Sequence, residues 1–347
     1  MINENKVKYL EKYLLRCIYD EAVFPGAEYA IVTRDSQYIN ALGYSQIVPK
    51  KIKIKENTIF DIASLTKVVA TTPCIILLLE YGEISLDTKI QSILPDFKHE
   101  NIRVLDLITH TSGLPSLKRY YKECKDLDEM KQSLYSTDLA YKTGEKVLYS
   151  DLGFILLGLI IEKITGSFTK FASEELFMPL EMEDTGFNPS AEKKERCAAT
   201  EDKGNRGIIK GEVHDGNAYF MGGVSGHAGL FSTAKDLSNY TKMILNNGYY
   251  KNQQILNGKS IRLMRNCFTK DLNEKRGLGW MVNYEYNCCD LASSDAIYHT
   301  GFTGTSILID EDFAFILLTN RVHPSRDNTK LIKTRRLINN IASTTTM

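Results

Sequence analysis

A serine and a lysine three residues apart, Ser64 and Lys67, stand where an extended segment runs into a long apolar helical pattern. Residues 58–63 are expected to be an extended segment, and from Ser64 onwards the apolar spacing becomes helical. Side chains three positions apart at a helix start lie on one face, about one turn from each other. The sequence therefore predicts a strand that enters a helix, with a hydroxyl and an amine side by side at the first turn.

This pair of side chains admits two interpretations. A lysine in that place can take or relay the hydroxyl proton, and a helix N-terminus favours the negative charge that develops beside it, so the pair suits a serine nucleophile. Serine is also a common helix cap, and lysine is common on helical surfaces. The four-residue pattern is short, and by itself it favours the cap.

Strand-like patterns gather at the two ends of the chain, with helical patterns between them. Strands are expected at 28–33 and 38–44, which form a hairpin, and again at 277–286, 297–300, 305–310 and 313–320. Helices are expected at 7–22, from Ser64 to Gly82 with a kink or interruption at Pro73, and at 104–109, 152–164, 168–177, 234–245 and 328–342. This order predicts one antiparallel sheet built from both termini and an inserted helical region.

The division that follows is a sheet region of 1–63 and 270–347 and a mainly helical region of 64–269, interleaved in one unit. A length of 347 residues suits one large domain or two interleaved ones. The loops 117–138 and 188–211 carry no pattern from which a conformation follows.

Two later segments change the interpretation of Ser64 and Lys67. Tyr149-Ser150-Asp151 follows a turn signal and precedes the apolar helix 152–164. His299-Thr300-Gly301 follows a short strand and leads into Phe302. The order Ser-x-x-Lys, then Tyr-x-Asp, then His-Thr-Gly resembles the three-part signature of penicillin-recognising serine enzymes. Further segments with the same resemblance are 107–115, 226–234 and 277–280.

The resemblance is to the branch with a tyrosine in the middle motif: class C β-lactamases, D-alanyl-D-alanine carboxypeptidases and related serine esterases. It extends from about Pro25 to about Arg321. It implies an α/β fold of the β-lactamase/DD-peptidase type, in which an antiparallel sheet flanked by helices stands beside an inserted all-helical subdomain. The active site of such a fold is expected in the crevice between the two parts.

The resemblance assigns catalytic roles to three residues. Ser64 is the expected nucleophile, and its attack on a carbonyl gives an acyl-enzyme. Lys67 is expected to act as a base if near neutral, or to stay charged and lower the pKa of Tyr149. Tyr149 is expected to take the proton of Ser64 and return it to the leaving group, which requires cations such as Lys67 or protonated His299 close by.

Four residues around the third motif are expected to bind substrate. The resemblance makes the backbone N–H groups of Ser64 and Phe302 the donors to a developing oxyanion. Gly301 suits a strand edge that the substrate approaches closely. Thr300 is a donor for a substrate carboxylate, and His299 stands where β-lactamases usually have lysine, so its pull on a carboxylate is weaker at neutral pH.

Asp151 is the second departure from the usual family pattern, because many members have asparagine there. An ionised carboxylate accepts hydrogen bonds but cannot donate one to a substrate amide carbonyl. Asp151 is counted with the expected substrate-binding residues. It is also expected to hold Lys67 by charge and to raise its pKa, which leaves Tyr149 as the better base. This substitution favours esters or small acyl groups over peptides and β-lactams.

The histidines outside the third motif do not suggest a metal site. His214 and His227 lack close metal-ligand spacing with Asp215, so neither a metal nor a cofactor is expected. The glycine-rich segment 221–226 is expected to line the crevice, braced by His214, Asp215 and Asn217. The segment after His110 is expected to be a helix C-terminal turn.

Composition restricts the partners and the compartment. Forty-three basic and forty-three acidic residues give zero net charge, which argues against nucleic acid or an anionic membrane surface as partner. The apolar stretches 74–79 and 154–161 are shorter than the ~20 residues of a membrane span. Seven irregularly spaced cysteines and a polar N-terminus predict a cytoplasmic protein, in tension with a role in building the cell wall.

The leading functional hypothesis is a serine hydrolase that acts through an acyl-Ser64 intermediate on a carboxylic ester or a D-alanyl-type amide. Penicillin binding or weak β-lactamase activity is compatible with it. The alternatives are a non-catalytic scaffold or ligand sensor with the same fold, and an acyltransferase to a small alcohol. The expected partner is a small acyl substrate, and the sequence does not indicate an oligomeric state.

Overall fold

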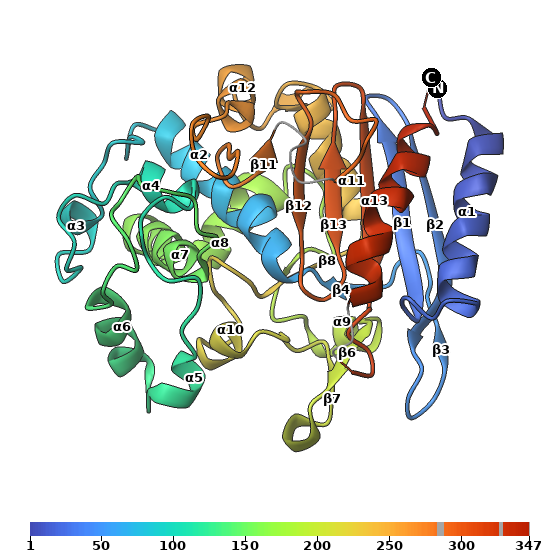
Figure 1. Cartoon of the computed structure of the whole chain (residues 1–347), viewed down its shortest axis with the longest axis horizontal. Coiled ribbons are helices and arrows are strands. Elements are labelled where there is room, and N and C mark those ends of the chain that lie inside the picture. The colour runs from blue at the N-terminus through green and yellow to red at the C-terminus, as the bar shows by residue number, and fades with distance from the viewer. Residues whose placement is uncertain (283–287, 326–328, 347) are drawn as a thin grey trace.

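A seven-stranded antiparallel sheet joins the two ends of the chain in the computed structural model, which describes residues 1–282, 288–325 and 329–346 (Figure 1). The strand order is β11-β12-β13-β14-β1-β2-β3. The bounds are β1 Gly26–Thr33, β2 Gln37–Gln46, β3 Ile52–Lys53, β11 Met281–Val282, β12 Ile297–Thr300, β13 Ser306–Ile309 and β14 Phe313–Thr319. The first and last strand groups meet where β1 pairs with β14, from Ala27 opposite Thr319 to Thr33 opposite Phe313.

Helices cover both faces of this sheet. The helices α1 (Glu4–Tyr19) and α13 (Thr329–Ser343) pack on one face, and α11 (Ala234–Leu245) packs against β1 and β14 on the other. The alternation along β14 accounts for this, because Phe315 and Leu317 join the core under α1 and α13 while Ile316 and Leu318 join the core of the helical side. The two termini lie together, with the Asn3 N–H donating to the Thr345 carbonyl at 2.7 Å (Figure 1).

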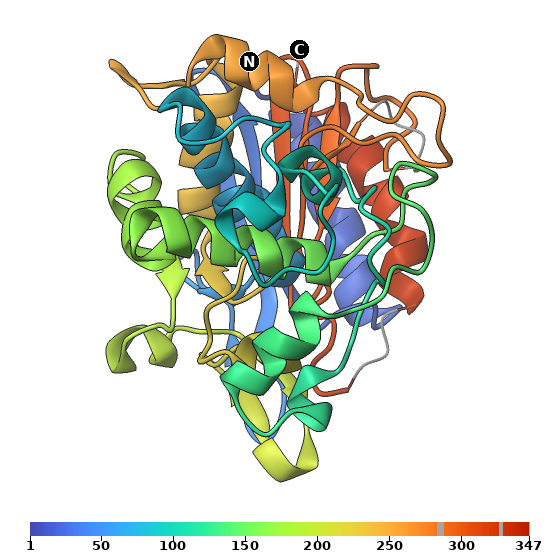
Figure 2. The same cartoon turned by 90° about the vertical axis from the view of Figure 1, so that its left-hand side faces the viewer.

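The helical side is built around α7 (Asp151–Thr165), which packs against α4 (Val104–Ile108), α8 (Phe168–Ala172) and α2 (Thr72–Glu80). Ser150 caps the first turn of α7 and Gly166 ends it in a left-handed conformation. Shorter helices, α3 (Ile90–Ile93), α5 (Tyr120–Glu123) and α6 (Leu127–Tyr135), lie at the outside of this half of the molecule (Figure 2).

The remaining elements are short. A three-stranded sheet of order β4-β8-β5 and two small hairpins lie outside the main sheet. Their bounds are β4 Phe60–Asp61, β5 Gly186–Phe187, β8 Leu230–Ser232, β6 Ala199–Asp202, β7 Ile208–Lys210, β9 Tyr249–Tyr250 and β10 Gln253–Gln254. The helices are α9 Ala191–Glu195, α10 Gly216–Phe220 and α12 Gly258–Arg265.

Most long elements lie where the sequence predicts them. The strand 297–300 and the helix 234–245 have the predicted bounds, and the hairpin 28–44 is β1 and β2 extended by two residues at each end. The helix expected at 7–22 begins three residues earlier, because Asn3 accepts hydrogen bonds from the N–H groups of the first turn.

Three predicted elements need correction. The strand expected at 277–286 is a turn at 277–280, where Gly277 N–H donates to the Trp280 carbonyl, followed by the short β11; residues 283–286 lie outside the described part. The helix from Ser64 is a 3₁₀ turn, a π-helical turn and then α2, with Pro73 in the first turn of α2, where its missing N–H is tolerated. The helix expected at 168–177 becomes π-helical after Ala172.

One continuous helical stretch, 63–80, is long and apolar enough to cross a membrane by length and composition, and 83% of it is buried inside the protein. The bent pair of α7 and the helical segment 168–177 passes the same test together, with an angle of 87° between its two parts. Burial against the sheet and neighbouring helices accounts for the apolar side chains of 63–80, as in the core helix of a globular domain.

Candidate active site

Ser64 lies in a tight turn between β4 and α2. Residues 58–78 are buried with one exception, the partly exposed Ser64. Ala63 has φ 48°, a left-handed conformation that costs a non-glycine residue about 1 kcal/mol. The carboxylate of Asp61 accepts a hydrogen bond from the Ala63 N–H at 2.9 Å and so stabilises this turn. A strained, hydrogen-bonded turn thus presents one hydroxyl from an otherwise buried segment.

Lys67 is fully buried, and each of its three ammonium hydrogens has an acceptor. Its Nζ lies 2.7 Å from Asp151 Oδ1, 2.9 Å from the His227 carbonyl oxygen and 3.2 Å from Ser64 Oγ. Burial alone would lower the pKa of Lys67, but the charge of Asp151, the neighbouring Tyr149 and their hydrogen bonds outweigh burial and raise it. The predicted effect of Asp151 is confirmed, and Lys67 is a charged donor toward Ser64.

Tyr149 completes the group around the hydroxyl. Its side chain hydrogen-bonds to Lys67 and Ser64, and its ring centre lies 4.9 Å from Lys67 Nζ. Burial raises the pKa of Tyr149, and the charge of Lys67 with these two hydrogen bonds offsets only part of that effect. The structure therefore corrects the expectation of a phenolate near neutral pH: in this state Tyr149 is a neutral phenol.

His299 lies close to Tyr149 but does not add a positive charge. The side chain is buried, its ring centre is 6.1 Å from that of Tyr149, and its Nδ1 lies 2.9 Å from the Thr300 carbonyl oxygen, to which it donates. Burial, together with the charges of Arg276 and Lys67, lowers the pKa of His299 well below its ordinary value. The expectation that protonated His299 serves as a cation for Tyr149 is therefore wrong.

The third motif is held directly against the turn that carries Ser64. Thr303 Oγ1 donates to the Asp61 carbonyl at 2.7 Å, and Thr305 Oγ1 donates to the Ile62 carbonyl at 3.0 Å. A Cβ atom on Gly301 would lie 2.3 Å from the Ile62 carbonyl oxygen, so only glycine permits this approach. The structure thus brings the His299–Phe302 segment beside the nucleophile turn.

Thr300 and Phe302 flank that glycine. Thr300 is the last residue of β12 and is half-buried. Phe302 is 42% exposed, and its ring stacks on the His214 ring with the centres 5.5 Å apart. The site therefore has a partly exposed hydroxyl on one side and an exposed aromatic ring on the other.

Asp151 reaches the site as the first residue of α7. Its N–H donates to the Ser116 carbonyl at 2.9 Å, and its side chain is 19% exposed. A carboxylate in the first turn of a helix interacts favourably with the helix dipole. Asp151 thus holds Lys67 as the sequence predicts, and its part in binding substrate stays a prediction.

The loop that contains His227 is braced differently from the prediction. His227 Nε2 lies 2.9 Å from Asp215 Oδ1 and its Nδ1 lies 2.8 Å from Ser225 Oγ, which fixes the carbonyl that accepts from Lys67. Asn217 instead donates to the Lys118 carbonyl, and His214 Nε2 contacts Glu201. Among the described residues, no group of three or more His, Cys, Asp or Glu side chains is placed to hold a metal ion.

Two residues near Tyr149 have no functional assignment from the sequence. His110 Nδ1 accepts the Ser150 N–H at 3.0 Å, and its ring centre is 4.6 Å from that of Tyr149. Arg276 lies with its guanidinium carbon 5.8 Å from the same ring centre. The sequence feature that could have identified them is their position: His110 lies within the segment 107–115, and Arg276 directly precedes the segment 277–280. His110 itself lies in the turn that follows α4, where a helix C-terminal turn is predicted.

Three segments far apart in the sequence thus converge on one hydroxyl group. Ser64 has a charged donor in Lys67 and a phenol in Tyr149 within hydrogen-bonding reach, and the His299–Phe302 segment packs beside its turn. A nucleophile, a proton carrier and an orienting charge are the parts that covalent catalysis requires.

Comparison with known sequences places these residues in a wider group. A sequence model of the Beta-lactamase family matches residues 13–340. The N-acetylmuramyl-L-alanine amidase of Bacillus subtilis is 36% identical over 87% of this chain and 78% of its own length. A candidate D-alanyl-D-alanine carboxypeptidase of Escherichia coli is 32% identical over 80% of this chain and 73% of its own.

Comparison with solved structures gives the same fold. A mutant of simvastatin synthase from Aspergillus terreus matches with a TM-score of 0.77 at 18% identity, over 98% of this chain and 97% of that one. The octameric penicillin-binding protein homologue from Pyrococcus abyssi matches with a TM-score of 0.73 at 22% identity, over 98% and 79%. These likenesses concern the fold alone, and they confirm the predicted fold class.

Proposed function

The chain belongs to the Beta-lactamase family, and from that premise we propose that it is a serine hydrolase in which Ser64 forms an acyl-enzyme. The observation that carries the proposal is the contact of Ser64 Oγ with the buried Lys67 ammonium at 3.2 Å, beside a phenol that hydrogen-bonds to both. A non-catalytic scaffold would not require a buried lysine that donates a hydrogen bond to Ser64, the one partly exposed residue of the segment 58–78.

The proposed acylation moves one proton and forms one bond. Ser64 Oγ attacks the substrate carbonyl carbon while its proton passes to the ionised form of Tyr149, and the carbonyl electron pair becomes an oxyanion. The backbone N–H groups of Ser64 and Phe302 are the proposed donors to that oxyanion. Its collapse expels the leaving group, which takes the proton from Tyr149; water then attacks the acyl-enzyme by the same steps.

Lys67 has an electrostatic role in this scheme. It remains charged, because Asp151 holds it, and it stabilises the phenolate form of Tyr149 and orients Ser64 Oγ. Thr300, Gly301 and His299 are proposed to contact the substrate, with neutral His299 giving a weaker attraction for a carboxylate than a lysine would.

For the substrate, we propose a carboxylic ester or a D-alanyl-type amide. The names of two relatives concern amide bonds, an N-acetylmuramyl-L-alanine amidase and a candidate D-alanyl-D-alanine carboxypeptidase, and these support an amide. Asp151 supports an ester, because a carboxylate bound to Lys67 cannot donate to an amide carbonyl. We rank ester and D-alanyl hydrolysis above turnover of β-lactams.

The test compares three substrates on the wild-type protein and on Ser64→Ala. Nitrocefin, a short-chain nitrophenyl ester and a D-alanyl-D-alanine peptide are assayed side by side, with and without a small alcohol as acyl acceptor. The proposal expects Ser64→Ala to lose at least a hundredfold in kcat on every substrate that the wild type turns over. Equal rates for the two proteins would contradict it, and an ester product with the alcohol would identify acyl transfer.

We also propose that the protein works in a reducing compartment, the cytoplasm. The support is that all seven cysteines are free, five of them buried, and that the adjacent Cys288 and Cys289 are both unpaired. Burial raises the pKa of Cys288 to about 11, so this thiol stays protonated and resists oxidation. Fractionation of the source cells, with an antibody to detect the protein, tests this proposal. Recovery of the protein from the fraction on the outer side of the cytoplasmic membrane would contradict it.

A further inference from the structure

Arg276 is a buried cation behind the candidate active site. The residue is 3% exposed, and its backbone is fixed because its N–H donates to Thr269 Oγ1 at 2.7 Å and its carbonyl accepts the Phe268 N–H at 2.8 Å. A buried charge is costly unless the surrounding groups compensate it. The environment of this guanidinium therefore calls for an explanation.

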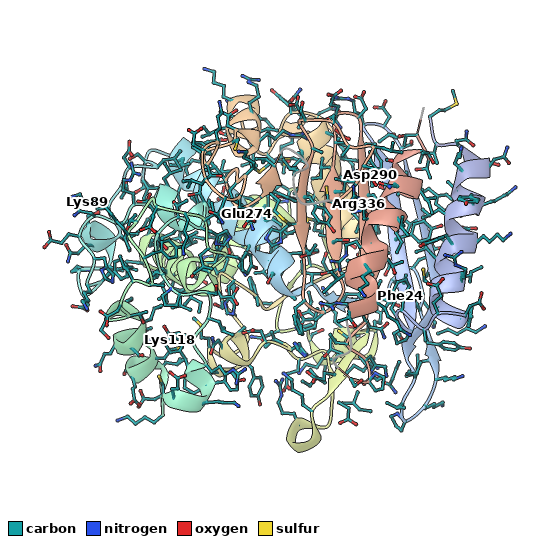
Figure 3. The ribbon with its side chains drawn as sticks, in the orientation of Figure 1. Phe24, Lys89, Lys118, Glu274, Asp290 and Arg336 are labelled. Carbon is teal, nitrogen blue, oxygen red and sulfur yellow. The ribbon has the colours of Figure 1, made fainter. Side chains whose placement is uncertain are left out.

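Only part of the guanidinium is paired. Its Nη2 forms an ion pair with Glu274, whose side chain is 14% exposed and is labelled near the centre of the view in Figure 3. Its Nε and Nη1 atoms are buried and have no hydrogen-bond partner among the described residues. The guanidinium carbon lies 5.8 Å from the ring centre of Tyr149, a distance at which a cation and an aromatic ring attract each other.

The other titratable groups around Tyr149 provide little net positive charge to stabilise its phenolate form. The charge of Lys67 is balanced by Asp151 at 2.7 Å. His110 and His299 are both buried, and burial together with the charge of Arg276 lowers the pKa of each well below its ordinary value. Both histidines are therefore neutral, and Arg276, whose guanidinium is paired with Glu274 through Nη2 only, is the second cation beside Tyr149 after Lys67.

We propose that Arg276 is a positioning residue that acts through Tyr149: its fixed charge stabilises the phenolate that receives the proton of Ser64. This inference rests on the proposed function and extends it. An arginine suits the role because its guanidinium stays charged at every pH at which the protein is folded. A lysine at position 299 would supply a positive charge close to Tyr149. Because this position holds the neutral His299, Arg276 supplies that charge instead.

Arg276 and Glu274 form a natural pair of opposite tests. Arg276→Met removes the cation and keeps an unbranched, though shorter, side chain, so the rising limb of the pH profile of kcat/KM should move to higher pH. Glu274→Gln removes the opposing carboxylate, so the limb should move to lower pH. Arg276→Lys keeps the charge and should lie close to the wild type. Each shift is expected to be about one pH unit, a tenfold change in rate on the limb.

A second readout follows Tyr149 without turnover. Carbon-13 labelling of the tyrosine ring reports ionisation by NMR, and Tyr149→Phe assigns the signal. The titration of Tyr149 should shift in the same directions as the rate profile in the two variants. The thermal unfolding midpoint of each variant is measured as a control for folding.

The outcomes separate the two proposals. If Arg276→Met and Glu274→Gln both lower the rate without moving the pH profile or the Tyr149 titration, Arg276 is structural and the inference is overturned. If Arg276→Met does not fold, Glu274→Gln alone decides, because a structural ion pair gives no downward shift. If the wild type forms no adduct at Ser64 but the titration shifts as expected, the proposed function fails while the Arg276–Tyr149 coupling stands.

Discussion

Lys67 and Asp151 form a 2.7 Å ion pair in which the lysine is fully buried and the carboxylate is partly exposed. Asp151 raises the pKa of Lys67, and in the proposed mechanism this leaves Tyr149 as the group that moves a proton. Asp151 also stands where many members of the family have asparagine, whose side-chain amide can donate a hydrogen bond to the substrate. In the proposed mechanism, Asp151 therefore affects both pH dependence and substrate choice.

Asp151→Asn should change the preference among substrates. The amide can donate to an amide or β-lactam carbonyl, a hydrogen bond of about 1 kcal/mol, so acylation by penicillin relative to ester hydrolysis should rise about fivefold. The buried Lys67 loses its charged partner, and stability should fall by about 3 kcal/mol. Acylation rates and urea unfolding of both proteins measure these effects. An unchanged ratio of the two acylation rates would show that Asp151 does not control selectivity.

The activity should increase with pH through the neutral range. Burial raises the pKa of Tyr149 above its ordinary value of 10, and the base is the deprotonated form. The fraction of enzyme in that form therefore rises about tenfold per pH unit until the folded-state pKa is reached. The measurement is kcat/KM for an ester from pH 6 upward, corrected for spontaneous hydrolysis, with Tyr149→Phe as control. A plateau already established at pH 7 is incompatible with this prediction.

Glu28 should make stability pH-dependent from a site far from the chemistry. Its side chain is completely buried on β1, with Oε1 accepting the Ala234 N–H at 3.3 Å and Oε2 without a partner among the described residues. Burial raises its pKa well above the ordinary value of 4.5. The stabilising effect of its proton is therefore complete below about pH 4.5 and is lost as pH rises toward the folded-state pKa.

Glu28→Gln removes this dependence. The difference in unfolding free energy between the variant and the wild type should grow in favour of the variant by about 1.4 kcal/mol per pH unit above pH 4.5, until the folded-state pKa is reached. Urea unfolding at a series of pH values measures it. A difference that stays constant from pH 4.5 to pH 8 argues that Glu28 is ionised in the folded protein.

Gly301→Ala should disrupt the site through a steric clash. The added Cβ would lie 2.1 Å from Thr305 Oγ1 and 2.3 Å from the Ile62 carbonyl, so the third motif must move away from the Ser64 turn. We expect a loss of about 2 kcal/mol in stability and at least a tenfold loss in kcat. Gly186→Ala is the matched control, because nothing lies within 4 Å of its added Cβ. Equal behaviour of the two variants would contradict the close packing of Gly301.

The sequence predicted those helices and strands whose apolar residues recur with a regular helical or strand spacing. The alternation in 297–300 and the apolar helix after Ser150 are local patterns, and the structure confirms both. The short strands β5 and β8 escaped prediction because two or three residues carry no period, whereas β4 lies within the extended segment predicted at 58–63. The loop 117–138 contains α5 and α6, which its mixed composition did not reveal.

The site was predictable as a set of residues but not as a set of charges. Ser64, Lys67 and Tyr149 come together as expected, because each lies at the end of an element that the sequence identifies. The lowered pKa of His299 depends on burial and on the charge of Arg276, and the raised pKa of Tyr149 depends on burial; both are tertiary effects. The division of the chain at 63 and 270 stays a prediction.

The most direct test of the account is mass spectrometry of the protein after incubation with a fluorophosphonate and, separately, with a labelled penicillin. The account predicts one covalent adduct, on the peptide that contains Ser64, and no adduct in Ser64→Ala. A wild-type protein that remains unmodified by both reagents, or that carries its label on another residue, would contradict the assignment of Ser64 as the nucleophile.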